Sequence, residues 1–484
     1  MLTIFHKQWW TRDCGGLEVM RLAVPMVISA GSISLMTFTD RVFLMWFHKD
    51  AMTASMQAGL FFWMLLSLPH ATAAYTNTFV AQYNGCGHHE RIGPVVWQGI
   101  FFSFLLMPFY FVVEPWIGLA FEMFGHDPFL AGMERSYLKI VLWSAGVSIA
   151  SEAVASFFYG RGKMHVVMNV NLVCVFLNAG LDWCMIFGHM GFPAWGLEGA
   201  AVATVLSQWV RLMILLGLVA WENGRGDRFG FLRGCRFDFP LLGRLLYFGL
   251  ASGVQVFSDA TAFTIFVLLI GSESFAGSGL GKQAANASSI AFTLNMFTFL
   301  PIVGTGIAVT TLVGNRIGHK QPDLAQRATV TALVLAVVYS AFFGMIYLLA
   351  PGFLLQAFEI YAENPVEFEA IRPLTIHLLW FVALYLFFDA LTIIFSSALK
   401  GAGDTTFVMI TTCLIVPLLP VLSFAGIYFA GFGLYWCWSV LAGWVIIFAA
   451  VFWQRFRRGK WKKMQVIERE MIENQVLVEN NCLY

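Results

Sequence analysis

Charge is scarce in this sequence. Asp, Glu, Lys and Arg make up 12% of its 484 residues, about half of the share that is usual in a soluble domain. The formal net charge is +1, so neither an acidic nor a basic partner is indicated, and no basic stripe predicts nucleic-acid binding. The eight cysteines form no CxxC pair and lie mostly in apolar segments, which argues against a metal site or a disulfide framework.

Long apolar runs take the place of the missing charge. The mean hydropathy is +0.73 and 59% of the residues are hydrophobic, and a run of about 20 such residues spans the hydrocarbon core of a bilayer. We predict an all-α integral membrane protein with twelve transmembrane helices. The predicted spans are 18–45, 53–80, 93–113, 136–157, 164–188, 197–221, 241–270, 284–314, 325–350, 373–399, 406–431 and 433–455.

The basic residues predict the orientation of these helices. If the N-terminus is cytoplasmic, about 22 of the 29 Lys and Arg residues fall on the inner side of the membrane, as the positive-inside rule requires. The sequence therefore predicts a multi-pass protein of the inner (cytoplasmic) cell membrane with both termini in the cytoplasm.

Two motifs occur twice. AQYNGCGHHERIGPVVWQG resembles GNRIGHKQPDLAQRATVTA, and FYGRGKMHVVM resembles LKGAGDTTFVM, with the copies roughly 230–240 residues apart and in the same order. This pattern predicts two six-helix lobes related by a pseudo-two-fold axis along the membrane normal. The predicted parts are an N-terminal lobe (1–221), a cytoplasmic linker (222–240), a C-terminal lobe (241–455) and a basic cytoplasmic tail (456–484) that is expected to anchor to anionic lipid.

Acidic residues within the spans of the first half predict an ion site, because such residues are costly in a membrane and usually mark a pathway. Asp40 and Asp182 lie in the outer parts of the first and fifth spans, and Asn178 precedes Asp182 by one helical turn on the same face. Two carboxylates with an amide oxygen suit a hard cation such as Na⁺. They suit a proton equally well, since two close carboxylates cannot both stay ionised.

The second half repeats this arrangement. Asp259 is near the middle of the seventh span and Asp389 near the middle of the tenth, with Tyr385 one turn before Asp389. These three residues predict a second cation or proton site, and Glu152 in the fourth span is a further polar candidate. For each acid, the alternative is a buried hydrogen bond that only fixes packing.

Prolines within the spans predict bends. Pro25 in the first span and Pro301 in the eighth each remove a backbone hydrogen bond, which allows either a hinge or a static kink. Asp404, in the motif GAGDTT, is predicted to cap the N-terminus of a helix.

Several stretches resemble the multidrug and toxin extrusion (MATE) family, and within it the bacterial NorM/DinF-like branch. RLAVPMVISAGSISLMTFTDRVFLM is similar to the family's first helix, and LNAGLDWCMIFGHMGFPAWGLEGAAVATVLSQ to its fifth and sixth. KQAANASSIAFTLNMFTFLPIVGTGIAVTTLVGNRIG is similar to its eighth helix, and SSALKGAGDTT resembles the turn after its tenth. The resemblance extends from about residue 19 to about residue 451 and rests on the order and spacing of these segments.

The resemblance implies a V-shaped bundle of two six-helix lobes that exports organic cations and other amphipathic compounds against inward flow of Na⁺ or H⁺. The positions that match the family's sites are Asp40, Asn178 and Asp182 for the first-lobe cation site, Asp259, Tyr385 and Asp389 for the second-lobe acidic site, and Gln283 and Asn286 for polar residues that open the eighth helix. The sequence departs from the family at Asp259, where Glu is usual, at Lys400, where Arg is common, and at Arg41, where a small residue is typical.

The predicted function is secondary active antiport by alternating access. The protein is expected to act as a monomer in the lipid bilayer on small organic substrates, without a cofactor and without a metal beyond a transported Na⁺. One alternative is a flippase for a lipid-linked saccharide, which needs several basic residues along its cavity, whereas Arg41 and Arg211 are almost the only ones within the spans. An enzyme is not expected, because the ten histidines lie largely in loops or near helix ends.

Overall fold

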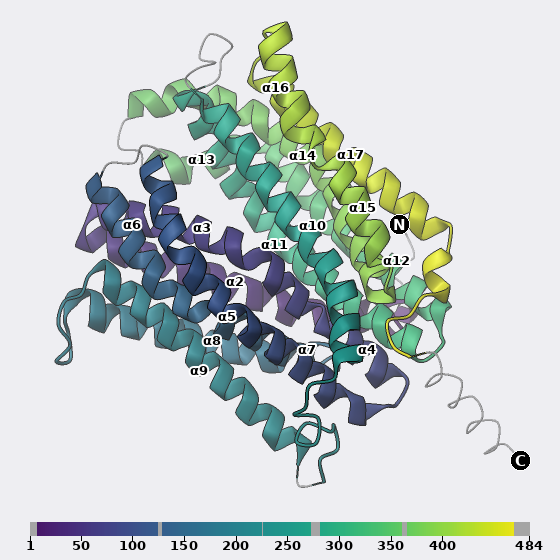
Figure 1. The fold of residues 1–484 in the computed structure, drawn as a ribbon. Helices are drawn as coiled ribbons and strands as arrows, with labels where there is room; N and C mark the ends of the chain where they lie inside the picture. Colours follow the sequence, from purple (N-terminus) through teal and green to yellow (C-terminus); the bar gives the residue numbers. More distant parts are fainter. Residues whose placement is uncertain (1–6, 124–127, 225, 273–280, 361–364, 469–484) are drawn as a thin grey trace, which may run out of the picture. The chain divides into compact units, whose positions relative to one another are not determined.

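The computed structural model describes residues 7–123, 128–224, 226–272, 281–360 and 365–468. Every regular element within these ranges is a helix (Figure 1). Twelve stretches of helix in the described residues are long and apolar enough to cross a membrane. The predicted fold class and the predicted number of spans are therefore confirmed.

Several spans consist of two consecutive helices. In chain order the spans are α2 (Gly16–Phe47), α3 with α4 (Lys49–Ala74, Thr76–Gly85), α5 (Ile92–Met123), α6 with α7 (Pro128–Val141, Ala145–Tyr159), α8 (Met164–Phe187), α9 (Leu197–Asn223), α10 (Phe239–Gly271), α11 (Lys282–Gly318), α12 (Pro322–Leu349), α14 (Pro365–Ala402), α15 with α16 (Thr405–Ile415, Leu418–Ala430) and α17 (Leu434–Arg457). Two short helices, α1 (Lys7–Thr11) and α13 (Pro351–Ile360), were not predicted.

The prolines act differently in different spans. α15 ends and α16 begins around Pro417, which lacks the N–H that would continue the helical hydrogen bonds. Pro25 and Pro301, in contrast, lie inside the continuous helices α2 and α11.

The contacts within the chain define two compact units. Unit 1 comprises Met1–Ala23, Gln255–Val313 and Pro322–Met464, and unit 2 comprises Val24–Val254, Gly314–Gln321 and Gln465–Tyr484. Three helices, α2, α10 and α11, therefore contribute to both units. In α2 the division falls between Ala23 and Val24, one residue before Pro25. These boundaries differ from the predicted limits of the two lobes, which follow the linker at 222–240.

Each unit is built by helices packing along one another. In unit 1, α14 packs against both α12 and α17 (Figure 1). In unit 2, α7 packs against α5 and α9, and α8 packs against α9. A core in unit 2 contains large buried side chains such as Phe102, Tyr110 and Ile149, so the charged residues described below lie within otherwise apolar packing.

The first repeated motif forms a close helix crossing within unit 2. Gly85 ends α4 and Gly318 ends α11, and a Cβ atom on either one would collide with the backbone of the other helix. Asn84 donates a hydrogen bond of 2.8 Å to Asn315, and Asn315 donates another of 2.8 Å to the carbonyl of Gly160. The glycines that make the two motifs look alike are therefore required where the two copies touch.

The predicted linker is packed against unit 2. Trp97 Nε1 donates a 2.7 Å hydrogen bond to the carbonyl of Phe231, and the carbonyl of Phe229 accepts one of 2.8 Å from Gly93. Asp227 accepts hydrogen bonds of 3.0 Å from the backbone N–H groups of Leu232 and Arg233. These contacts give the polar segment between α9 and α10 a fixed fold.

The first residues of the predicted tail contact the rest of the chain. The N–H of Val466 donates a 2.9 Å hydrogen bond to Gln82 Oε1, and its carbonyl accepts one from Arg244. Glu468 accepts a 2.9 Å hydrogen bond from the Tyr83 hydroxyl and forms an ion pair with Arg244. All five residues belong to unit 2, so the segment after Met464 is held there. Residues 469–484 of the predicted tail lie outside the described residues.

Candidate functional site

Asp40, Asn178 and Asp182 come together within unit 2. With its amide turned to satisfy both neighbours, Asn178 places its side-chain nitrogen 2.7 Å from Asp40 Oδ1 and 3.2 Å from Asp182 Oδ2. Asp40 and Asp182 also interact directly with each other. Asn178 and Asp182 are fully buried and Asp40 is half-buried. The three residues thus form one contiguous polar cluster, the carboxyl pair bridged by Asn178.

The helix ends determine where this cluster lies. α8 ends at Phe187 because Gly188 adopts φ +77°, a left-handed conformation in which glycine is favoured. Asp182 therefore lies in the second-last turn of α8, and Asp40 lies about two turns before the end of α2. Arg41 is exposed, in agreement with the divergence of neighbouring side chains on a helix.

The chemistry of the cluster favours binding of one positive charge. Two carboxyl groups can share a hydrogen bond only if one of them carries a proton. Asp182 Oδ1 is also buried, and no donor among the described residues bonds to it. No group of three or more His, Cys, Asp or Glu side chains that could hold a metal ion occurs in the described ranges. Two carboxyl groups this close to one another suit a proton or a hard monovalent cation.

The second set of acids lies within unit 1. Asp259 is on α10, and Asp389 and Tyr385 are one turn apart on α14. Asp259 interacts electrostatically with Asp389, and Asp389 with the buried Tyr385. The structure thus brings all three predicted residues into one neighbourhood.

Lys400 belongs to the same neighbourhood and was not predicted as part of the site. It lies in the last turn of α14 and interacts electrostatically with Asp259. Its position eleven residues after Asp389, close to three helical turns, places both on one face of α14. In the sequence, this spacing and the family's preference for Arg at this position both pointed to Lys400.

Glu152 has a charged partner that local sequence patterns did not indicate. Arg211 Nη2 lies 3.4 Å from Glu152 Oε2, and His70 Nε2 lies 3.9 Å from the same oxygen. Arg211 is 8% exposed, and a buried cation within a span requires such a partner. Glu152, Arg211 and His70 all belong to unit 2.

The remaining predicted polar residues are more peripheral. Gln283 and Asn286 are exposed in the first turns of α11, in unit 1. They are not among the residues that line the cavity described below.

The prediction that Asp404 caps a helix is wrong. Asp404 occupies the position before α15, but its side chain makes no capping hydrogen bond. Its carboxylate instead accepts two hydrogen bonds from Arg455 of α17, at 2.7 and 3.1 Å. The charged guanidinium of Arg455 attracts the buried carboxylate more strongly than neutral backbone N–H groups do.

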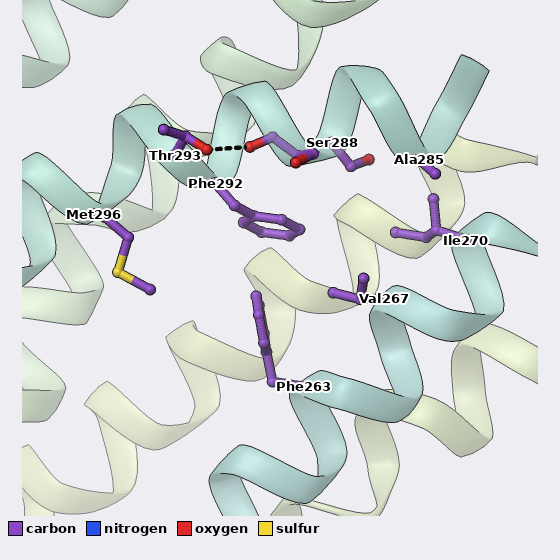
Figure 2. A pocket seen from close by; sticks show the side chains of 9 residues that line it. Phe263, Val267, Ile270, Ala285, Ser288, Phe292, Thr293 and Met296 are labelled. Carbon is purple, nitrogen blue, oxygen red and sulfur yellow. Dashed lines mark hydrogen bonds between the residues drawn. The ribbon is translucent and has the colours of Figure 1, made fainter. Parts of the chain in front are cut away.

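Unit 1 contains a cavity of about 250 Å³ between α10 and α11. Figure 2 shows Phe263 and Val267 of α10 facing Phe292 and Met296 of α11, with Thr293 bonded to the helix backbone. Phe263 and Phe292 meet edge to face, with ring centroids 4.9 Å apart. Phe263 follows Asp259 by one turn of α10, so the aromatic lining continues the face that carries the acid.

These features define a class of protein: a multi-pass helical membrane transporter with carboxyl groups inside its spans. The family model MatE matches residues 25–184 and 252–425. The chain belongs to this family, and the predicted resemblance is confirmed.

Individual relatives agree with this assignment. The chain is 26% identical to the probable multidrug resistance protein NorM of Thermotoga maritima, over 94% of this chain and 95% of that protein. It is 27% identical to the multidrug resistance protein PmpM of Pseudomonas aeruginosa, over 82% and 80%. A MOP superfamily transporter from Pyrococcus furiosus has the same fold, with a TM-score of 0.81 at 20% identity, covering 94% of this chain and 98% of that chain.

Proposed function

We propose that this protein is a secondary active antiporter that exports small amphipathic or cationic organic compounds in exchange for inward-moving Na⁺ or H⁺. The observation that carries the proposal is the pair of carboxyl groups, Asp40 and Asp182, that the buried Asn178 amide bridges. This cluster binds one positive charge and loses its charge repulsion when it does. The names of the curated relatives support multidrug compounds as substrates.

In this proposal the ion enters from outside and neutralises the carboxyl pair. Neutralisation changes the preferred bend of α2 at Pro25, where the division between the two contact units crosses that helix. Alternating access then exposes the substrate to the outside, and Pro301 provides a second bend in α11. The membrane potential contributes about 2.3 kcal/mol per charge for each 100 mV, in addition to the ion gradient.

Unit 1 supplies the proposed substrate-binding features. Asp259 and Asp389 would provide negative charge for an organic cation, with Tyr385 as a polar neighbour, and the cavity one turn along α10 from Asp259 offers aromatic and Met side chains. Organic cations bind favourably over aromatic faces. The nine residues that line the cavity carry no charge, which does not support the flippase alternative, because a lipid-linked saccharide carries phosphates.

The proposed setting is the cell membrane, with both termini in the cytoplasm and the protein acting as a monomer. The test is efflux of a fluorescent organic cation from vesicles with the purified protein, with Na⁺ and H⁺ gradients imposed separately. One gradient should drive efflux, Asp40→Asn should abolish the ion dependence, and Asp389→Asn should weaken substrate binding. Ion-driven efflux that persists in Asp40→Asn would overturn the assigned role of the carboxyl pair.

A further inference from the structure

A chain of buried hydrogen bonds links four helices of unit 2, and two of these helices also carry the carboxyl pair. Arg211 Nε donates a 3.0 Å hydrogen bond to Asn171 Oδ1, and Asn171 Nδ2 donates one of 2.6 Å to Ser29 Oγ. Arg211 also pairs with Glu152. Ser29, Asn171 and Arg211 are each less than a tenth exposed. This relay joins α2, α7, α8 and α9, all within unit 2.

The relay and the carboxyl pair connect the same two helices. Ser29 lies eleven residues before Asp40 on α2, and Asn171 lies seven residues before Asn178 on α8. These intervals are close to three and two full helical turns, so each pair of residues lies on one face of its helix. α2 and α8 are thus bridged at two levels, by Asn171 with Ser29 and by Asn178 with Asp40.

The hydrogen bond between Asn171 and Ser29 also fixes the position of α2 close to Pro25. Ser29 is one turn after Pro25, where α2 lacks a backbone hydrogen bond and resists bending least. Holding Ser29 against Asn171 therefore fixes the direction in which the outer part of α2 leaves the bend. That direction determines whether Asp40 reaches Asn178 and Asp182.

We infer that Arg211 and Asn171 are positioning residues for the ion site. Arg211 is suited to this role because one side chain contacts Asn171 through Nε and Glu152 through Nη2, while Glu152 cancels its charge. Arg211 can therefore position the carboxyl pair without adding net charge to the helix bundle, because Glu152 neutralises it. The inference rests on the proposed function, since it takes Asp40 and Asp182 as the binding site of the driving ion.

The test compares Ser29→Ala, Asn171→Leu and Arg211→Lys with Thr329→Val. Thr329 is also buried, and within the described residues its hydroxyl bonds to the carbonyl of Ala325 in its own helix. The relay variants should raise the ion concentration for half-maximal efflux about fivefold, the effect of one lost buried hydrogen bond, with the maximal rate retained. Ser29→Ala should add nothing to Asn171→Leu, because Asn171→Leu already removes the bond to Ser29 together with the one from Arg211. Ser29→Thr should retain the affinity of the wild type.

A second readout does not depend on transport. Dicyclohexylcarbodiimide modifies protonated carboxyl groups in apolar surroundings, so its rate of reaction with Asp40 and Asp182 can be followed by mass spectrometry in detergent. The relay variants should change this rate at least fivefold, and Thr329→Val should not. Altered labelling without any ion-driven efflux in the wild type would support positioning and reject the proposed function. Unaltered labelling together with unaltered ion affinity would overturn the inference.

Discussion

Asp404 and Arg455 form a two-point ion pair between the start of α15 and the end of α17, and the corresponding pair in the first half has the opposite polarity. In the second repeated motif, Lys163 occupies the position of Asp404. Lys163 Nζ lies 2.8 Å from Glu222, near the end of α9. The duplicated turn is therefore tied to the last helix of its own half in both copies, with the charges exchanged.

Removing one member of the Asp404–Arg455 pair should destabilise the protein. The side chain of Asp404 is 4% exposed, and breaking a buried pair typically costs about 3–5 kcal/mol because the remaining charge is uncompensated. Asp404→Asn and Arg455→Gln should each lower the temperature of thermal inactivation in detergent. The exchange Asp404→Arg with Arg455→Asp should recover part of the loss, and a double variant that is worse than both singles would contradict the pairing.

The cavity predicts a change in substrate affinity without a change in ion affinity. Phe263→Ala removes an aromatic face from the lining, so the KM for an aromatic cation should rise by about two- to tenfold, the usual value of one aromatic contact. Efflux kinetics at varied substrate and at varied ion concentration separate the two effects. Phe257→Ala is the matched control, since Phe257 is also exposed on α10 but is not part of the lining. Equal effects of both substitutions would reject the cavity as a binding site.

The segment between α9 and α10 predicts a pH-dependent contribution to stability. Burial raises the pKa of Asp227, but hydrogen bonds from the N–H groups of Leu232 and Arg233 and from Asn223 outweigh it, so its pKa is lowered. A carboxylate with a lowered pKa stabilises the fold above its unfolded pKa of about 3.9, and this contribution is lost as the pH falls through the folded pKa.

Asp227→Asn should therefore lower the Tm at pH 7 by about 2 °C, and this deficit should shrink as the pH falls below the unfolded pKa of about 3.9. Differential scanning fluorimetry across this range measures both limits. Glu198→Gln, at an exposed position, should leave the Tm unchanged throughout. A constant deficit of Asp227→Asn at every pH would show that the loss is steric and not electrostatic.

The tail contacts predict protection from protease. Arg244→Gln removes both the hydrogen bond to Val466 and the ion pair with Glu468, so trypsin should cleave after Lys462 or Lys463 several times faster than in the wild type. Asp323→Asn is the matched control, because the Asp323–Lys462 pair is largely exposed and such pairs contribute little. Equal cleavage rates in wild type and Arg244→Gln would show that the segment is not held in solution.

The fold followed from the sequence because each span carries its own signal. Apolar length predicts a transmembrane helix without knowledge of its neighbours, and the spacing of Asn178 and Asp182 placed them on one face of one helix. Their meeting with Asp40 was predicted from depth alone.

Contacts between distant helices were much harder to predict. Arg211 is 59 residues from Glu152, and no periodicity relates them, although a lone Arg in an apolar span requires an acidic partner. Asp404 was assigned to a cap because its local motif resembles one, while its partner Arg455 is 51 residues away. The basic residues of the tail predicted contact with lipid. In the structure, the start of the tail is held by the contacts of Val466 and Glu468 with Arg244.

The exchanged charges also bear on how a duplicated chain sorts its own helices during insertion. Both halves offer the same turn and the same kind of closing helix, so either closing helix has the shape to approach either turn. A mismatched pairing would place Lys163 against Arg455, or Asp404 against Glu222, in a setting where like charges repel strongly. The reversed polarity thus labels each half, so that the end of α9 and the end of α17 recognise only their own copy of the turn.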